Sequence, residues 1–214
     1  MRQAERAKER RKSLLFIVLA VVVGIGLIAA AAIPALNSED DPGGGQLASY
    51  GVSKAAANCE PVESQAVQGE GDHQPDGTRV EYEDVPPMFG PHSGSAEFPA
   101  RSFYSDADGV PVEKLVHNLE HGYTVLWYDP SVSDRKVEVL QNIAEAGRQV
   151  EASGQKFVVA AWDDSYGEMS ADYGLTHWGA EEGYRQMCGD ISGDVVEDFL
   201  TAYPYTDSPE PNAG

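Results

Sequence analysis

The chain has 214 residues, with 15 basic and 35 acidic side chains and a formal net charge of −20 at pH 7. An acidic body of this kind repels nucleic acid and anionic lipid headgroups, so we expect no nucleic-acid partner, whereas cations and basic protein surfaces are favoured. The length is sufficient for one well-buried domain together with an anchoring segment.

The N-terminal segment is basic and is followed by a long apolar run. Residues 1–12 carry six basic and two acidic side chains, and residues 13–38 carry none. The 20 mostly apolar positions Leu14–Ile33 match the length needed to cross a bilayer core of about 30 Å. Basic residues on the N-terminal side place the N-terminus in the cytoplasm. The pattern predicts a cytoplasmic segment 1–13, a single transmembrane helix within 14–36 and an extracytoplasmic domain at the cell membrane.

A cleaved signal peptide is the alternative, because the small residues Ala29–Ala32 and Ala35 follow the apolar run. Either interpretation exports the rest of the chain. Residues 37–46 are polar and glycine-rich, which predicts a flexible linker. We expect one exported globular domain over 47–205 and a disordered tail over 206–214.

The sequence has two cysteines, Cys59 and Cys188, and both lie in the predicted exported part. In an oxidising compartment this even count favours a disulfide bond between them; the alternative is two separate thiols. Residues 60–110 show no sustained period, which predicts extended segments and loops, with Val80 and Tyr82 indicating one short strand. Their aromatic content argues against disorder.

Residues 112–119 have the pattern of an amphipathic helix, with apolar side chains at 112, 115, 116 and 119. Pro111 suits its first turn and Gly122 suits its end. His117 and His121 then share the face opposite the apolar stripe. Two imidazoles one turn apart are suitable metal ligands. The alternative is a polar surface near a helix C-terminus, where imidazolium is favoured.

A regular pattern follows this helix. Residues 123–128 and 156–162 have the composition of buried strands, and residues 132–150 that of a helix between them. This order predicts a βαβ unit with adjacent parallel strands. A short helix is expected at 193–203. The predicted fold class is α+β or α/β.

Two further histidines precede the helix. His92 lies in the segment 85–94, which has three prolines and two glycines. Such a segment is conformationally restricted, which suits a histidine that must be aimed, although a rigid turn with a solvent-facing histidine has the same composition. His73 follows Asp72 in a polar segment. The fifth histidine, His177, is expected to be an ordinary surface or packing residue.

These motifs together resemble one family. They are Asp-His (72–73), Val-x-Tyr (80–82), Pro-Pro-x-x-Gly-x-His (86–92), His-x-Leu-Glu-His-Gly (117–122), Tyr-x-Pro (128–130) and Ala-Trp (161–162). They are similar to the domain-of-unknown-function family 3105, whose members are membrane-anchored or secreted and mostly of actinobacterial type. The resemblance covers roughly residues 70–165 and implies no established activity. It singles out the four histidines and Glu120, whereas relatives with Asn-Cys-Gly before the helix differ from residues 101–104 here.

We therefore predict that His73, His92, His117 and His121 converge on one transition-metal ion. Imidazole ligands suit copper and zinc alike, and Met88 would be an optional soft ligand for copper. Glu120 and Asp72 are the nearest carboxylates that could orient the rings. The predicted function is a metal-binding module serving metal handling or assembly of a membrane protein complex.

Two other functions compete with this one, so the sequence leaves open whether the protein is an enzyme. His117-x-x-Glu120-His121 has the form of a zinc-peptidase signature in which the glutamate is the general base. The third ligand would then be Glu181 or Glu182. The other alternative is a structural partner domain whose histidines only hydrogen-bond one another and nearby carboxylates.

Overall fold

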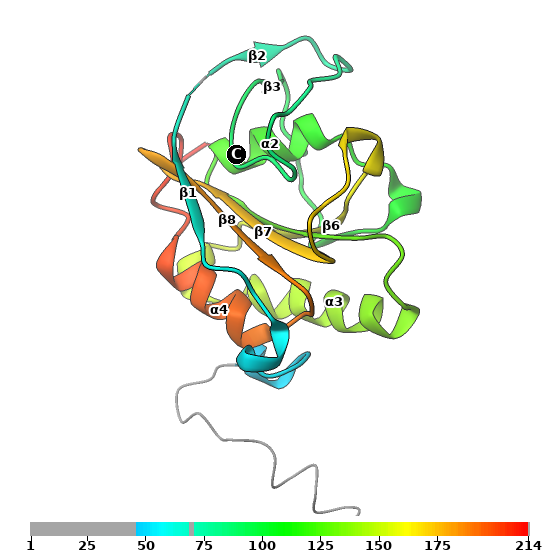
Figure 1. The fold of residues 1–214 in the computed structure, drawn as a ribbon. Helices are drawn as coiled ribbons and strands as arrows, with labels where there is room; N and C mark the ends of the chain where they lie inside the picture. The colour runs from blue at the N-terminus through cyan, green and yellow to red at the C-terminus, as the bar shows by residue number, and fades with distance from the viewer. Residues whose placement is uncertain (1–45, 69–70, 214) are drawn as a thin grey trace, which may run out of the picture. The chain divides into compact units, whose positions relative to one another are not determined.

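The structure is a computed structural model that describes residues 46–68 and 71–213. In this part of the chain a six-stranded mixed sheet has the order β1–β8–β7–β5–β6–β4, and β2 and β3 form a separate two-stranded ladder (Figure 1). The elements in chain order are η1 (Gln46–Ser49), η2 (Lys54–Ala57), β1 (Glu63–Ala66), β2 (His73–Gln74), β3 (His92–Ser93), β4 (Phe103–Tyr104), η3 (Asp106–Asp108), α2 (Val112–Glu120), β5 (Thr124–Tyr128), α3 (Asp134–Gly147), η4 (Glu151–Ser153), β6 (Phe157–Ala161), η5 (Asp164–Tyr166), β7 (Tyr173–Trp178), β8 (Glu182–Cys188) and α4 (Gly193–Ala202).

The predicted transmembrane helix and linker lie outside the described residues, apart from Gln46. Among the residues that are described, no helix has both the length and the apolar character needed to cross a membrane.

The predicted βαβ unit is confirmed. Strands β5 and β6 are adjacent and parallel, with Trp127 paired to Ala160, and α3 connects them. The short strand β4 adds to β6, also in parallel, whereas β7, β8 and β1 continue the other side of the sheet in antiparallel pairs. The α+β content expected from the sequence is therefore present.

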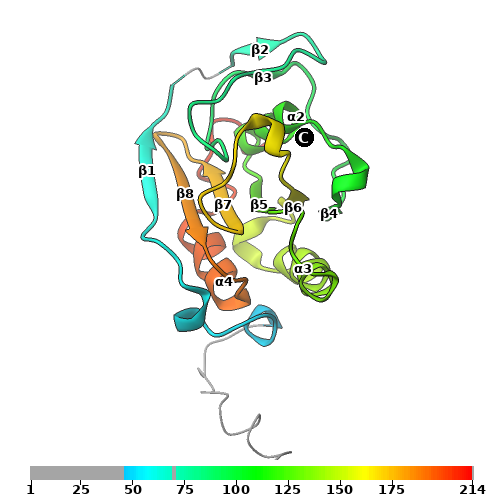
Figure 2. The same ribbon diagram turned by 45° about the vertical axis from the view of Figure 1, so that its right-hand side comes forward.

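Helices cover both faces of the sheet. Figures 1 and 2 show α3 and α4 on one face and α2 with the β2–β3 ladder on the other. Alternate residues of β5 point to opposite faces of the sheet. Leu126 and Tyr128 belong to the core between the sheet and helices α3 and α4, and Val125 and Trp127 belong to the core between the sheet and α2. Because both faces are buried, β5 reads as a continuous apolar run with no alternation.

The sequence prediction missed six strands and added one. Strands β1, β2, β3 and β4 lie in a region that was interpreted mainly as extended segments and loops, and the glycines and polar residues of β7 and β8 interrupt any apolar run. The strand expected around Val80 and Tyr82 is wrong. Val80 instead donates its N–H to the buried carboxylate of Glu113, so a side chain takes the place of a strand partner.

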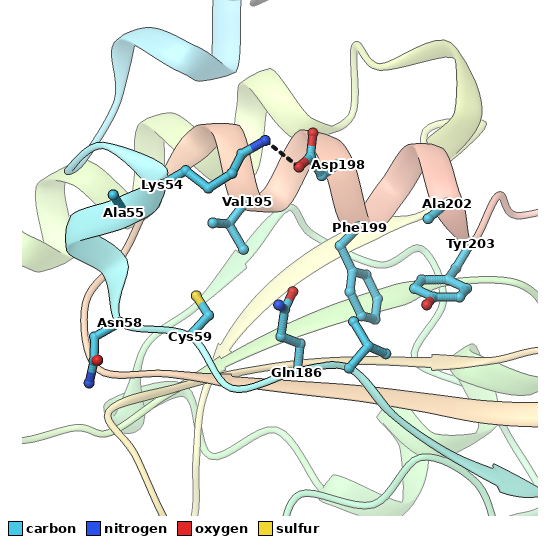
Figure 3. A pocket seen from close by; sticks show the side chains of 11 residues that line it. Lys54, Ala55, Asn58, Cys59, Gln186, Val195, Asp198, Phe199, Ala202 and Tyr203 are labelled. Atoms are coloured by element: carbon cyan, nitrogen blue, oxygen red, sulfur yellow. Dashed lines mark hydrogen bonds and ion pairs between the residues drawn. The ribbon is translucent and has the colours of Figure 1, made fainter.

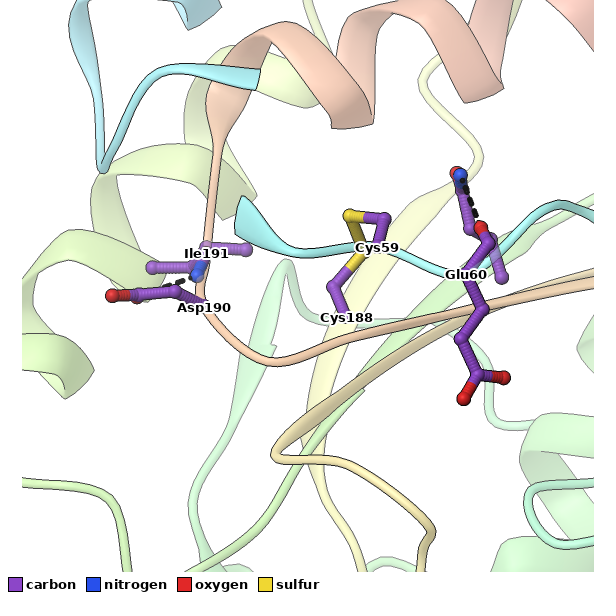
Figure 4. The surroundings of a disulfide bond; sticks show 6 residues. Cys59, Glu60, Cys188, Asp190 and Ile191 are labelled. Atoms are coloured by element: carbon purple, nitrogen blue, oxygen red, sulfur yellow. Dashed lines mark hydrogen bonds between the residues drawn. A yellow bond between two sulfur atoms is a disulfide. The ribbon is translucent and has the colours of Figure 1, made fainter. Parts of the chain in front are cut away.

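The predicted disulfide is confirmed. Cys59 and Cys188 are bonded, with an S–S distance of 2.01 Å, and the two residues also form an isolated β-bridge (Figure 4). The bond ties the start of the domain to the end of β8, across 129 positions of sequence.

The expectation of a disordered tail differs from the structure, which describes the tail through residue 213 as a packed segment. The ammonium of Lys156 donates to the carbonyls of His121, Pro211 and Ala213 at 2.8–2.9 Å. The N–H of Glu210 donates to the carbonyl of Glu120 at 3.0 Å. Composition alone indicated disorder, whereas two carbonyls of the tail accept from Lys156, just before β6, and the Glu210 N–H donates to the last residue of α2.

Candidate metal centre

The β2–β3 ladder brings two histidines together. His73 and His92 are direct partners in its parallel register. The ladder is held by His92 N–H donating to the Asp72 carbonyl at 3.1 Å and Gly94 N–H donating to the Gln74 carbonyl at 2.7 Å. The ring centroids of the two histidines are consequently 4.8 Å apart. The stiff segment around His92 thus aims this side chain toward α2.

Helix α2 supplies the other side of the site. Its apolar stripe packs on the sheet, and its polar face is covered by the segment that carries β3. His117 and Glu120, three residues apart on that face, are 6% and 2% exposed. His121 follows as the C-cap of the helix. The histidine face predicted from the helical period is therefore buried.

The side chains converge on a small volume. Ligand atoms of His73, His92, His117 and Glu120 all lie within 4.8 Å of one another. Oε2 of Glu120 is 3.1 Å from Nε2 of His92 and 3.5 Å from Nε2 of His73. Glu120 therefore lies among the imidazoles, in direct contact with two of them.

Backbone carbonyls orient two of the rings. Nδ1 of His92 contacts the Gly90 carbonyl at 2.8 Å, and Nδ1 of His117 contacts the Ser93 carbonyl at 2.7 Å. A carbonyl only accepts, so Nδ1 carries the proton in both rings. In the neutral rings Nε2 is then an unprotonated nitrogen directed toward the other ring atoms of the cluster. This is the tautomer in which a histidine ligates a metal ion through Nε2.

The carboxylate of Glu120 is held as an anion. Oε1 accepts from the Gly71 N–H at 2.8 Å. Burial on its own raises the pKa of Glu120, but the His92 ring and the Gly71 N–H outweigh it and hold the pKa at about 2. Among the described residues, Oε2 of Glu120 and Nε2 of His92 are buried without a hydrogen-bond partner, although they face one another.

Two of the histidines, His117 and His121, favour their neutral form. Burial lowers the pKa of His117, and the neighbouring imidazoles lower it further against the opposing effect of the Ser93 carbonyl. Burial also lowers the pKa of His121, although Glu210 and Glu120 oppose that shift. Neutral imidazole is the form that binds metal ions, so these shifts favour the metal-binding form of His117 and His121.

His121 occupies an adjoining position. Its Nε2 lies 3.1 Å from Nε2 of His117 and 3.4 Å from Oε2 of Glu210. Its ligand atom groups with those of Glu120 and Glu210, again within 4.8 Å. The structure thus places three of the four predicted histidines in one group with Glu120, and the fourth in a second group that shares Glu120.

Other residues singled out from the sequence lie elsewhere. The Asp72 carboxylate accepts from Gln74, so carbonyls orient the rings in its place. Met88 is buried close to Gly183 on β8. His177 is a packing residue, bonded to Thr124 and to the Asp207 carbonyl. Glu181 and Glu182 are absent from the metal-competent groups found among the described residues.

Sequence reasoning missed Glu210. It lies in a segment interpreted as a disordered tail, yet it reaches His121 from a position 89 residues along the chain. The one available signal was its setting between Pro209 and Pro211, since two prolines restrict the backbone on either side of a single acidic side chain.

A separate groove of about 520 Å³ lies along α4, on the other face of the sheet (Figure 3). The disulfide residue Cys59 and the aromatic rings of Phe199 and Tyr203 line it, and an ion pair between Lys54 and Asp198 borders it. It lacks the histidine cluster.

The fold and the site define a mixed α/β domain with a buried histidine–glutamate cluster between a helix and a two-stranded ladder. The chain belongs to the family described as Protein of unknown function (DUF3105), which matches residues 73–214. The match begins at His73 and includes every residue of both side-chain groups. No curated protein and no solved structure matches the chain.

Proposed function

We propose that this protein is a metal-binding module that holds one divalent zinc or copper ion through His73, His92, His117 and Glu120. One observation carries the proposal. Oε2 of Glu120 faces Nε2 of His92 at 3.1 Å, and among the described residues both atoms are buried without a hydrogen-bond partner. When the His92 ring carries its single proton on Nδ1, two lone pairs face one another, and they repel unless a metal ion or a proton lies between them.

The donor set suits a first-row transition metal. Three neutral imidazoles and one carboxylate give four ligands, the number that structural zinc sites use, and imidazole binds copper equally well. Two ligands of a tetrahedral ion at 2.0–2.1 Å are about 3.3 Å apart. The contacts of 3.1 and 3.5 Å to Glu120 are close to this value. The 4.8 Å limit on the whole group requires only small side-chain shifts.

The exposure of the ligands suggests a route for the ion. His92, His117 and Glu120 are buried, whereas the side chain of His73 is 45% exposed. Three pre-positioned ligands would receive an ion that enters past His73, and His73 would complete the shell.

Glu120 as a ligand favours binding over hydrolysis. In the peptidase interpretation this glutamate is the general base and a later acidic residue is the third ligand. Here its carboxylate contacts the rings directly, and α2 ends at Glu120 instead of continuing. Glu120 therefore acts in this proposal as a metal ligand and not as a general base.

We also propose that the domain is extracytoplasmic, held by a single-pass helix within residues 14–36 whose N-terminus is cytoplasmic. The disulfide supports an oxidising compartment. The basic N-terminal segment and the apolar run that follows it support the orientation. A metal-handling or membrane-complex role is compatible with this position.

The test is metal stoichiometry of the purified full-length chain. After removal of metal by a chelator and dialysis against Zn²⁺ or Cu²⁺, elemental analysis should find stable binding to the wild type. His73→Ala should lose affinity without loss of fold, because this side chain is partly exposed. Gln74→Ala, the next residue of the same strand, is the matched control and should bind as the wild type does.

Co²⁺ provides a spectroscopic readout of the same site. A four-coordinate Co²⁺ complex has intense visible absorption bands, which should appear for the wild type and Gln74→Ala and weaken for His73→Ala. Equal, substoichiometric metal in all three proteins would contradict the proposal. The cluster would then be a structural feature in which a shared proton joins His92 to Glu120.

A further inference from the structure

A second group of potential ligands adjoins the first and shares one residue with it. Ligand atoms of Glu120, His121 and Glu210 lie within 4.8 Å of one another. Nε2 of His121 is 3.4 Å from Oε2 of Glu210 and 3.1 Å from Nε2 of His117. A carboxylate has about four lone-pair directions over its two oxygens, so Glu120 has the capacity to serve both groups.

The position of Glu210 is built by the fold. Its own N–H donates to the carbonyl of Glu120, so the two glutamates are joined through the backbone. On the C-terminal side, Lys156 fixes the carbonyls of Pro211 and Ala213. On the N-terminal side, the carbonyl of Asp207 is bonded to Nε2 of the buried His177.

Gly122 permits the close approach of this segment to α2. It has φ +87°, and a Cβ there would lie 2.3 Å from the carbonyl oxygen of Tyr205. The end of α2 therefore requires glycine both for its backbone conformation and for the contact with the tail. These contacts hold the tail beside His121.

Buried atoms without partners point to a missing cation. Among the described residues, Oε2 of Glu120 and Nδ1 of His121 are buried and make no hydrogen bond. Glu120 is 2% exposed, so water does not satisfy this oxygen from the bulk. Nε2 of His121 is the ring atom that contacts His117 and Glu210.

The charges around the second group favour a cation. The carboxylates of Glu120 and Glu210 both lie close to His121. The nearby positive group is Lys156, whose ammonium donates to three backbone carbonyls. The group thus contains two carboxylates, and the ammonium of Lys156 is engaged by three backbone carbonyls.

We propose that Glu120, His121 and Glu210 hold a second divalent cation, and that Glu120 bridges it to the ion of the first group. This inference rests on the proposed function, because it presupposes that ion. Protein two-metal sites have ions about 3.5–4 Å apart. The second ion would have three protein ligands, so one or more positions remain for water or for an anionic oxygen ligand. The first ion, by comparison, would have all four coordination positions filled by protein ligands.

The experiment counts metal ions per chain in the full-length protein. Metal-free wild type is titrated with Zn²⁺ by calorimetry, and the loaded protein is analysed for metal after buffer exchange. The wild type should bind two equivalents, and Glu210→Gln should bind one with unchanged affinity for the first. The Glu210 side chain is 54% exposed, so this substitution should leave the fold intact. Glu182→Gln, an exposed carboxylate on β8, is the matched control and should bind two.

Loading with Cu²⁺ reports whether the two bound ions are close together, which stoichiometry alone does not. Two carboxylate-bridged Cu²⁺ ions couple magnetically, which broadens or removes the signal of an isolated ion in electron paramagnetic resonance. The wild type should show coupling at two equivalents, and Glu210→Gln should show an isolated ion.

The outcomes separate the two proposals. One equivalent in both wild type and Glu210→Gln would overturn the second site and leave the first intact. Two uncoupled equivalents that persist in Glu210→Gln would overturn the second site as well, because that ion would lie elsewhere. No stable binding by the wild type would overturn both proposals.

Discussion

Nε2 of His92 faces Oε2 of Glu120 at 3.1 Å, although the two residues come from a two-residue strand and a helix 28 positions apart. The Gly90 carbonyl fixes the proton of His92 on Nδ1, and the Gly71 N–H fixes the other oxygen of Glu120. The contact is therefore maintained by backbone groups on both sides. The free energy of this contact differs according to whether a metal ion, a proton or neither lies between Nε2 of His92 and Oε2 of Glu120. A substitution at this contact therefore tests the proposed metal site directly.

Glu120→Gln should separate metal binding from stability. The amide oxygen can still accept from Gly71, and the amide nitrogen can donate to Nε2 of His92. We expect the metal-free variant to be at least as stable as the wild type, by up to about 1 kcal/mol, the net value of one hydrogen bond. Loss of the anionic ligand should weaken metal binding more than about 100-fold, since removing even an outer-shell partner costs 10–100-fold.

Chemical denaturation with and without Zn²⁺ measures both effects. The increase in the unfolding midpoint on adding Zn²⁺ should be large for the wild type and nearly absent for Glu120→Gln. If metal-free Glu120→Gln were strongly destabilised, the Glu120 carboxylate would stabilise the histidines by itself, without a metal ion. That result would contradict the expectation.

Removal of the disulfide should destabilise the domain without changing the site. The bond closes a loop across 129 positions, for which the chain-entropy model gives about 5 kcal/mol, an upper value because native strain and residual structure reduce it. The double variant Cys59→Ala, Cys188→Ala should therefore unfold at lower denaturant concentration and bind metal normally. A reducing agent should lower the stability of the wild type and leave that of the double variant unchanged; equal stabilities of the two oxidised proteins would contradict the expectation.

The stability of the metal-free protein should fall as pH decreases below about 6.5. Burial lowers the pKa of His177 below its usual value of 6.5, so the unfolded chain binds the proton first. Stability is then fully present above pH 6.5 and is lost as pH falls toward the lower, folded-state pKa. One such histidine contributes a slope of at most about 1.4 kcal/mol per pH unit.

His177→Gln tests this assignment, because glutamine can still donate to the Asp207 carbonyl but does not titrate. Denaturation between pH 5 and pH 6.5, above the range in which carboxylates titrate, should give a shallower slope than in the wild type. A residual slope is expected, since burial lowers the pKa of His117 and His121 in the same direction. An unchanged slope would show that His177 is protonated in the folded state.

The sequence predicted those features that arise from local periodicity. The apolar stripe of α2 predicted that His117 and His121 lie on one side of the helix, and the buried runs of β5 and β6 indicated their parallel pairing. The pairing of His73 with His92 was less accessible, because it depends on a two-residue ladder within a long irregular segment. Glu210 was missed because its place is determined by contacts of its neighbours with Lys156, which have no period in the sequence.

Lys156 should control the order of the tail. Its ammonium donates to the carbonyls of His121, Pro211 and Ala213, and burial lowers its pKa. Lys156→Met keeps the aliphatic length but leaves three carbonyls without their charged donor. Hydrogen bonds to charged groups contribute about 1.5–3 kcal/mol each, and much of this is recovered where the freed carbonyls reach water. We therefore expect a loss of about 1–3 kcal/mol, concentrated in the tail.

Amide hydrogen exchange of the full-length chain, followed by mass spectrometry of peptides, measures the effect. Peptides covering residues 204–213 should exchange faster in Lys156→Met, whereas peptides from α3 and β5 should be unchanged. Lys114→Met is the matched control, because the Lys114 ammonium forms a partly exposed ion pair with Glu97 at 3.6 Å, far from the tail in sequence. Equal protection of the tail in both variants would mean that the Glu210 N–H and the Asp207 carbonyl hold it without Lys156, and that Lys156 contributes only to the cap of α2.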